Sequence, residues 1–309
     1  MNPQNPDRSR PGWSLVWSDE FDGDTVDRTK WDFDLGNGFY DYRNHAWVPG
    51  WGNEELQYYT HEPENVVVTD SCLHIRAVKA PLHGCGYTSA RLKTRRRDGT
   101  VLFATRYGRV EFRARVPWGK GLWPALWMLP VDDAYGPWAA SGEIDLMEIV
   151  GEKPHEVLNS IHFGSAFPHR SLVTTTHALP GGSLVSDWHS YAVEWEPGRI
   201  RFYVDDVQTC TYDHWWSCHR LRDGLGVQAA DDSDLHPWPA PFDRPFYLLM
   251  NVAVGGNFPG VPNEKTRFPA ELVVDYVRVY EKVGGYGPVA PRGAGAMPWQ
   301  PGYVAERRN

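Results

Sequence analysis

Hydrophobic and polar residues alternate in short runs along most of the chain, and glycine, proline, asparagine and aspartate separate these runs. Residues 73–77 place Leu73, Ile75 and Ala77 on one face, with polar side chains on the other. Residues 109–116 repeat the pattern with four apolar side chains. Strict alternation of this kind is typical of a half-buried strand. The pattern therefore predicts an antiparallel β protein.

Two later segments extend this prediction. Residues 191–206 contain two alternating runs joined by Pro197-Gly198, which indicates a hairpin. Residues 272–280, LVVDYVRVY, predict a late strand. We find no segment with helix caps and a 3.6-residue period, and no internal repeat. Strands without a helical layer must bury their apolar faces against another sheet, so we expect an all-β sandwich of two antiparallel sheets, of the jelly-roll kind.

The expected domain covers residues 12–283. Residues 1–11 are expected to form an N-terminal tail. Residues 284–309 are rich in glycine, proline and alanine and have no periodicity, so they predict a flexible C-terminal tail. With 309 residues, the chain is long enough for one large β domain and its core.

Charge and hydropathy exclude several classes of partner. The net charge of -8 argues against nucleic acid. A basic run at residues 91–97 alternates and leads to a turn at Asp98-Gly99, which predicts a solvated edge strand. No run approaches the roughly 18 apolar residues of a membrane helix, and the start of the sequence lacks the apolar stretch of a secretion signal.

The four cysteines show no metal-binding spacing. Cys72, Cys85, Cys210 and Cys218 allow up to two disulfides in three connectivities, or four free thiols. The twelve histidines form no H-E-x-x-H motif, and the glycines form no dinucleotide-binding motif. We therefore expect catalysis without a cofactor.

The most informative stretch is SGEIDLMEIVG, which holds Glu143, Asp145 and Glu148 within six positions. Strict alternation would place Glu148 on the face opposite the other two acids. One extra residue, most simply Met147, would form a β-bulge and reset the phase. All three carboxylates would then lie on the outer face. The apolar residues of the same strand would then face the core: Ile144, Leu146 and Ile149.

The expected spacing of the glutamates favours one kind of chemistry. A bulged span is worth about four strand steps, or roughly 13 Å between Cα atoms. Side chains that lean together would bring the carboxyl groups to about 5 Å, the separation typical of a retaining glycosidase. An exposed acidic face and a calcium site are alternative interpretations of the same cluster.

With EIDLME at its centre, the chain resembles the laminarinase-like branch of glycoside hydrolase family sixteen. The likeness extends in order through WSDEFDG, WGNEELQYYT, TSARL, YGRVEFRARVPWGKGLWPALWMLP, GPWAASG, IHFG, YAVEWEPGRIRFYVDD, PFYLLMNVAVGGNFPG and VDYVRVY. The resemblance implies a β-jelly roll with a concave carbohydrate-binding cleft. It also implies retaining endo-hydrolysis of β-1,3-glucan, and of mixed β-1,3-1,4-glucan as a further substrate.

The resemblance implies roles for the acids. Glu143 matches the nucleophile, Glu148 the general acid/base and Asp145 the residue that assists between them. Trp138 and Trp123 match aromatic positions of the sugar-binding cleft.

Three polar residues match cleft positions that hydrogen-bond sugar hydroxyls: Asn53, Arg91 and His162. Glu20 and Asp275 match the neighbourhood of a structural calcium on the opposite side of the domain. We expect a monomer that acts on a polysaccharide and is secreted or periplasmic, without a nucleic-acid or membrane partner.

Two rival functions remain open. A same-family hydrolase of another polymer, such as agarose or carrageenan, would share the motif, although sulfated galactans call for more cationic groups than this acidic chain offers. A noncatalytic β-glucan recognition module is the second rival, and its relatives have lost the glutamates that are present here.

Overall fold

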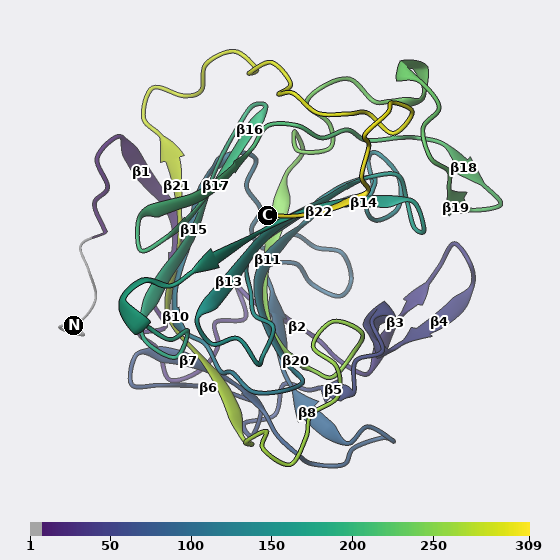
Figure 1. Ribbon diagram of the computed structural model, residues 1–309. Coiled ribbons are helices and arrows are strands. Elements are labelled where there is room, and N and C mark those ends of the chain that lie inside the picture. Colours follow the sequence, from purple (N-terminus) through teal and green to yellow (C-terminus); the bar gives the residue numbers. More distant parts are fainter. Residues whose placement is uncertain (1–7) are drawn as a thin grey trace.

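The computed structural model describes residues 8–309, and two large sheets dominate it (Figure 1). We name each sheet after one of its strands. The β10 sheet consists, in spatial order, of β17 (Val207–Tyr212), β16 (Arg199–Val204), β15 (His189–Glu196), β10 (Gly108–Arg115), β21 (Ala270–Lys282), β7 (Cys72–Ala77) and β6 (Val66–Thr69), with β1 (Trp13–Asp19) also paired to β21.

The β12 sheet also has eight strands. In spatial order these are β2 (Asp32–Asp34), β9 (Arg91–Lys93), β20 (Phe246–Val254), β11 (Leu122–Pro130), β12 (Glu143–Glu148), β13 (Glu156–Gly164), β14 (Arg170–Ala178) and β22 (Glu306–Arg308). Neighbouring strands of this sheet run antiparallel to each other, except β14 and β22, which are parallel.

Small elements complete the described chain. Three two-stranded pairs are present: β3 (Gly38–Asp41) with β4 (Ala46–Pro49), β5 (Gln57–Tyr59) with β8 (Tyr87–Ser89), and β18 (Leu221–Arg222) with β19 (Leu225–Gly226). The helices in residues 8–309 are the 3-10 turns η1 (Gly50–Gly52), η2 (Pro180–Gly182) and η3 (Asp232–Asp234). None of these described helices is long and apolar enough to cross a membrane.

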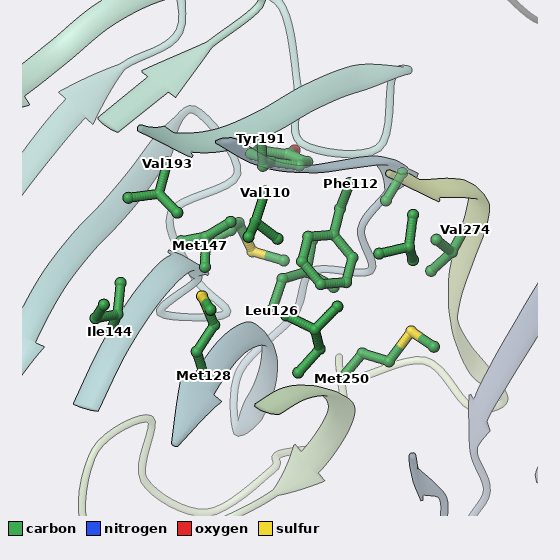
Figure 2. Close-up of a cluster of buried hydrophobic side chains, with 14 of the residues drawn as sticks. Val110, Phe112, Leu126, Met128, Ile144, Met147, Tyr191, Val193, Met250 and Val274 are labelled. Carbon is green, nitrogen blue, oxygen red and sulfur yellow. The ribbon is translucent and has the colours of Figure 1, made fainter. Parts of the chain in front are cut away.

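The core lies between the two sheets. Val110, Phe112 and Val193 from the β10 sheet face Leu126 and Met128 from the β12 sheet (Figure 2). All of them are buried, because alternation turns every second side chain of each strand inward. The predicted sandwich of two sheets is therefore confirmed.

The individual strand predictions agree with this arrangement. Leu73, Ile75 and Ala77 are fully buried on β7. The hairpin around Pro197-Gly198 is formed by β15 and β16, which pair from Glu196 with Arg199 onward. The late strand is β21, which runs through the middle of the β10 sheet and pairs with β1, β7 and β10.

The basic run does not form a solvated edge strand, so this prediction is wrong. β9 lies between β2 and β20, and both Arg91 and Lys93 are buried. Ion pairs with Asp34 compensate both cations, which the alternation of the sequence could not reveal. The turn at Asp98-Gly99 is present, with a hydrogen bond from the Gly99 N–H to the Arg96 carbonyl.

The C-terminal segment differs from the flexible tail that its composition predicts. In Figure 1 it is yellow and crosses from β21 over the molecule to β22, which pairs with β14. Met297 is buried, and Trp299 and Tyr303 pack against the core. Three large side chains therefore anchor a segment that has no periodic pattern of its own. At the other end, residues 1–7 of the predicted N-terminal tail lie outside the described residues.

All four cysteines lie within the described residues and are free. Cys72 and Cys218 are buried, while Cys85 and Cys210 are half-buried. Of the alternatives left open by the sequence, the structure has the four free thiols.

Candidate active site

The three acidic residues lie on β12, between β11 and β13 near the middle of the β12 sheet. Asp145 pairs with Ser160 of β13, and Glu148 pairs with Leu158. Three steps along β12 thus correspond to two along β13, which is the signature of a β-bulge. The register with β11 shifts at the same place. The predicted bulge is present and involves Leu146 and Met147.

The bulge directs an additional apolar residue inward. Ile144, Leu146 and Ile149 are fully buried, as predicted, and Met147 is fully buried as well. Figure 2 shows Met147 in the core close to Val110. Two successive side chains enter the core here, which restores the alternation for the residues that follow.

Two tryptophan indoles hold the two glutamates. The Trp138 indole N–H donates to Oε2 of Glu143 at 2.6 Å. The Trp123 indole N–H donates to Oε1 of Glu148 at 3.0 Å, and the Ser160 hydroxyl donates to Oε2 of Glu148 at 3.3 Å. These donors stabilise the ionised carboxylates and fix their orientation, because hydrogen bonds to charged acceptors are stronger than neutral ones.

Burial dominates the electrostatics of the site. Burial and the charge of Glu148 raise the pKa of Glu143 to about 7, although hydrogen bonds from Trp138 and Asp145 act in the opposite direction. Burial also raises the pKa of Glu148, opposed by its bonds from Trp123 and Ser160. Carboxyl groups that interact this closely titrate as a unit. Glu143 therefore exchanges its proton near neutral pH.

Asp145 holds its proton more firmly than an ordinary aspartate. Burial, followed by the charges of Glu143 and Glu148, raises its pKa well above the usual range. A hydrogen bond links it to Glu143, and this bond lowers the pKa of Glu143 while raising that of Asp145. We therefore place the shared proton on Asp145, which favours an ionised Glu143.

His162 is a neutral neighbour of these acids. Burial lowers its pKa to about 3, and the nearby Arg170 acts in the same direction. Its Nε2 lies 3.4 Å from Oδ2 of Asp145 and 3.8 Å from Oε1 of Glu143. Its Nδ1 has no hydrogen-bond partner within residues 8–309. A neutral imidazole can donate one hydrogen bond to the acids or to a ligand.

A transverse row of paired residues connects Arg91 with the acids. Arg91 of β9 pairs with Asn251 of β20, which pairs with Ala125 of β11. Ala125 in turn pairs with Glu148. Three strand spacings of about 4.8 Å separate Arg91 from Glu148 by roughly 14 Å. Residues of the row therefore lie within the reach of one extended oligomeric ligand.

The Arg91 guanidinium is enclosed by aromatic rings and acids. It lies 4.2 Å from the ring centroid of Trp51 and 4.6 Å from that of Tyr59. Its Nη2 is 3.6 Å from Oε2 of Glu55, and the other carboxylate oxygen, Oε1, accepts a hydrogen bond from the Asn53 amide. Asn53 itself is exposed. The structure thus brings Asn53 and Arg91 into one network, linked through Glu55.

Comparison with known proteins agrees with this geometry. The family model described as glycosyl hydrolases family 16 matches residues 53–216. The chain belongs to glycosyl hydrolase family 16. It is 44% identical over 278 residues to a beta-glucanase of Rhodothermus marinus, with 88% of this chain and 87% of the relative covered.

Two further relatives of this family 16 chain carry similar names. A glucan endo-1,3-beta-glucosidase A1 of Niallia circulans is 42% identical over 283 residues, and the match covers 88% of this chain but only 38% of that protein. The solved laminarinase catalytic domain of Thermotoga maritima superposes with a TM-score of 0.69 at 37% identity, covering 87% of this chain and 98% of that domain.

Several residues of this family 16 site were missed by the sequence analysis. Trp127 donates its indole N–H to the Asn251 side chain at 2.8 Å, and Ser160 donates to Glu148. Arg170 lies close enough to influence the pKa values of both glutamates. Trp127 of β11 and Asn251 of β20 alternate with core residues along their strands, so a strand prediction for these segments could have suggested them. For Arg170 the sequence offers no such signal.

The two acids expected near a structural calcium both pair with arginines. Glu20 forms a buried ion pair with Arg278 at 2.8 Å, and Asp275 forms one with Arg113 at 2.5 Å. Within the described residues, neither acid belongs to a group of three or more potential metal ligands. Their negative charges are already balanced by guanidinium groups, and calcium requires six to eight oxygen ligands. The structure therefore does not bring these two carboxylates together as a cation site.

Proposed function

We propose that the protein is a retaining endo-β-1,3-glucanase that cleaves internal bonds of laminarin-like glucans, with mixed β-1,3-1,4-glucan as a second substrate. The observation that carries the proposal is the bulged strand β12, on which tryptophan indoles hold Glu143 and Glu148 separately. Each glutamate thereby has its own donor and its own environment, as two different catalytic roles require.

In the first step, Glu148 acts as the general acid. It transfers its proton to the glycosidic oxygen while the bond from this oxygen to the anomeric carbon breaks. The carboxylate of Glu143 attacks the same carbon and forms a glycosyl ester with inverted configuration. Asp145 supports the attack, because the proton that it holds keeps Glu143 ionised.

In the second step, Glu148 acts as the general base. Its carboxylate takes a proton from a water molecule, and the resulting hydroxyl attacks the anomeric carbon. The ester bond to Glu143 breaks, and the second inversion restores the β configuration. The Trp123 and Ser160 donors stabilise Glu148 while it is ionised between the two steps.

We propose that the substrate chain extends along the transverse row from β12 toward β9. Arg91 and Asn53 would hydrogen-bond its hydroxyl groups, and the Trp123 and Trp138 rings would pack against sugar faces. His162 would contribute one further hydrogen bond, since its imidazole is neutral. The name of the Rhodothermus marinus relative, a beta-glucanase, supports this substrate class.

The experiment that tests the function compares Glu143→Gln with the wild type. We expect Glu143→Gln to abolish reducing-sugar release from laminarin and to retain glucan binding in affinity electrophoresis, because only the nucleophilic charge is removed. Glu156→Gln, which breaks the exposed ion pair with Lys153, is the matched control and should retain activity. Full hydrolysis by Glu143→Gln would exclude Glu143 as the nucleophile.

Two further measurements distinguish the rival functions. A panel of laminarin, lichenan, curdlan, agarose and carrageenan, with products sized over time, identifies the polymer. A wild-type protein that binds glucan without releasing sugar would be a recognition module. Proton NMR of the first product should show the β anomer, and an α anomer would contradict the retaining mechanism.

We further propose that the protein works as a monomer, secreted or in the periplasm. The proposed location rests on the size of the substrate, because a polymeric glucan is degraded outside the cytoplasm. Catalysis is proposed to need no cofactor. A structural calcium near Glu20 and Asp275 stays a prediction, and both carboxylates also pair with arginines.

A further inference from the structure

Arg170 lies beside the candidate active site, at the first position of β14. Its guanidinium carbon is 5.6 Å from the ring centroid of Trp138. A guanidinium within about 6 Å of an indole face is attracted by the ring quadrupole, whose negative side lies over the face. The same indole donates its N–H to Glu143. Arg170 thus contacts the proposed nucleophile through one intervening side chain.

The other side of Arg170 is held by the C-terminal strand. Its Nη2 is 3.0 Å from Oε1 of Glu306, which belongs to β22. Backbone hydrogen bonds fix β22 on β14: the Leu172 N–H donates to the Ala305 carbonyl, and the Thr176 N–H donates to the Asn309 carbonyl. β22 therefore presents Glu306 from an ordered position beside β14 (Figure 1).

Side-chain packing secures the segment that carries Glu306. The Tyr303 hydroxyl lies 2.7 Å from the Ser171 hydroxyl, and the Tyr303 ring lies against Trp216 with centroids 5.5 Å apart. Ser171 is the neighbour of Arg170 in the sequence. The start of β14 is thus attached to the C-terminal segment through Ser171 as well as through Arg170.

Trp138 has a third contact that restricts its orientation. The His162 ring lies 5.4 Å from it with an interplanar angle of 42°. The indole is therefore held by Arg170, by His162 and by its bond to Glu143. If Arg170 lost its position, the indole could tilt and its N–H could no longer point at the Glu143 oxygen.

We propose that Arg170, held in place by Glu306, is a positioning residue that keeps the Trp138 indole aligned on Glu143. The inference rests on the proposed function and adds a role for the C-terminal strand in it. Glu306 has a second effect: it supplies the guanidinium with a carboxylate partner away from the active site. Without that partner, Arg170 could turn toward the acids and pair with the nucleophile.

The first experiment reads the indole directly and does not depend on activity. In ¹⁵N-tryptophan NMR spectra, the Trp138 indole signal is assigned by its loss in Trp138→Phe. We expect this signal to move in Arg170→Gln and in Glu306→Gln. It should stay in place in Glu156→Gln, which breaks an ion pair on the neighbouring strand β13.

The second experiment measures laminarin hydrolysis across pH. For Arg170→Gln we expect kcat to fall about three- to tenfold, as for the loss of a partly buried cation–π contact. The acid limb of its pH–rate profile should move to higher pH. Arg170→Lys retains the positive charge and should keep the acid limb of the profile in place. An ammonium group does not stack on an indole as guanidinium does, so kcat should lie between those of Arg170→Gln and the wild type. Glu306→Gln should lower kcat while KM changes less than about twofold.

Each outcome has a defined meaning. An unmoved indole signal in both Arg170→Gln and Glu306→Gln would overturn the proposal, as would equal losses of activity in Glu306→Gln and Glu156→Gln. If the wild type hydrolysed no glucan but the indole signal still moved as expected, the proposed function would fail and the positioning of Trp138 by Arg170 would stand.

Discussion

Replacing Trp138 by phenylalanine tests whether the indole N–H controls the ionisation of Glu143. The variant keeps an aromatic ring but removes the 2.6 Å hydrogen bond to Oε2. This bond stabilises the ionised carboxylate, so its loss raises the pKa of Glu143 above its value of about 7. A hydrogen bond to a charged group contributes about 1.5–3 kcal/mol, and one pKa unit corresponds to about 1.36 kcal/mol. The lower end of this range gives an increase of about one unit, which we use below.

The sign of the effect follows from the role of Glu143. A nucleophile acts in its ionised form, so the acid limb of kcat/KM should move to higher pH by about one unit. At pH 7 the ionised fraction would fall from about one half to about one tenth, and the rate would fall about fivefold. Initial rates of reducing-sugar release from laminarin between pH 4 and 9 measure both quantities.

A matched control is available on the same sheet. Trp127→Phe also removes an indole N–H, but its 2.8 Å acceptor is the amide of Asn251, which does not titrate in this range. The acid limb should therefore stay in place in Trp127→Phe. A Trp138→Phe variant whose acid limb coincides with that of the wild type would refute the reasoning, and so would equal shifts in both variants.

Three other perturbations have defined outcomes. Trp123→Phe removes a donor that lowers the pKa of Glu148. Glu148 must stay protonated to act as an acid, so the alkaline limb of the pH–rate profile should move up by as much as about one pH unit in the same assay. Phe112→Ala opens a cavity between the sheets and should lower the free energy of unfolding by about 3–5 kcal/mol in urea titrations. A chelator should shift the melting temperature by less than about 1 °C, because Arg278 already balances Glu20; a larger shift would reveal a bound cation.

The fold was predictable because each strand carries its own signal. On β7 and β10, every second residue is apolar, and these residues fill the space between the sheets. The burial of β9 was not predicted, since Arg91 and Lys93 are residue types typical of a solvated edge strand. Their burial depends on Asp34, which lies far away in the sequence and reaches them through the pairing of β2 with β9.

The strand that carries the three acids was predictable for a different reason. The mismatch of Glu148 with strict alternation required a phase shift, and the single bulge that provides it also turns Ile149 toward the core. The sequence could not show that Met147 would also enter the core beside Leu146. That outcome depends on the space between the sheets, which only the assembled core defines.

The contact between Arg170 and Glu306 could not be predicted from sequence patterns. Both residues are charged and partly exposed, and they are 136 positions apart in the chain, so no local period relates them to each other or to EIDLME. Their meeting depends on β22 being added as a parallel strand outside β14. An active-site contact of this kind depends on the order of the strands in the sheet. The placement of the β12 acids depends instead on the alternation of side chains along a single strand. Variation in a C-terminal segment can therefore change the surroundings of the proposed nucleophile while the motif itself stays the same.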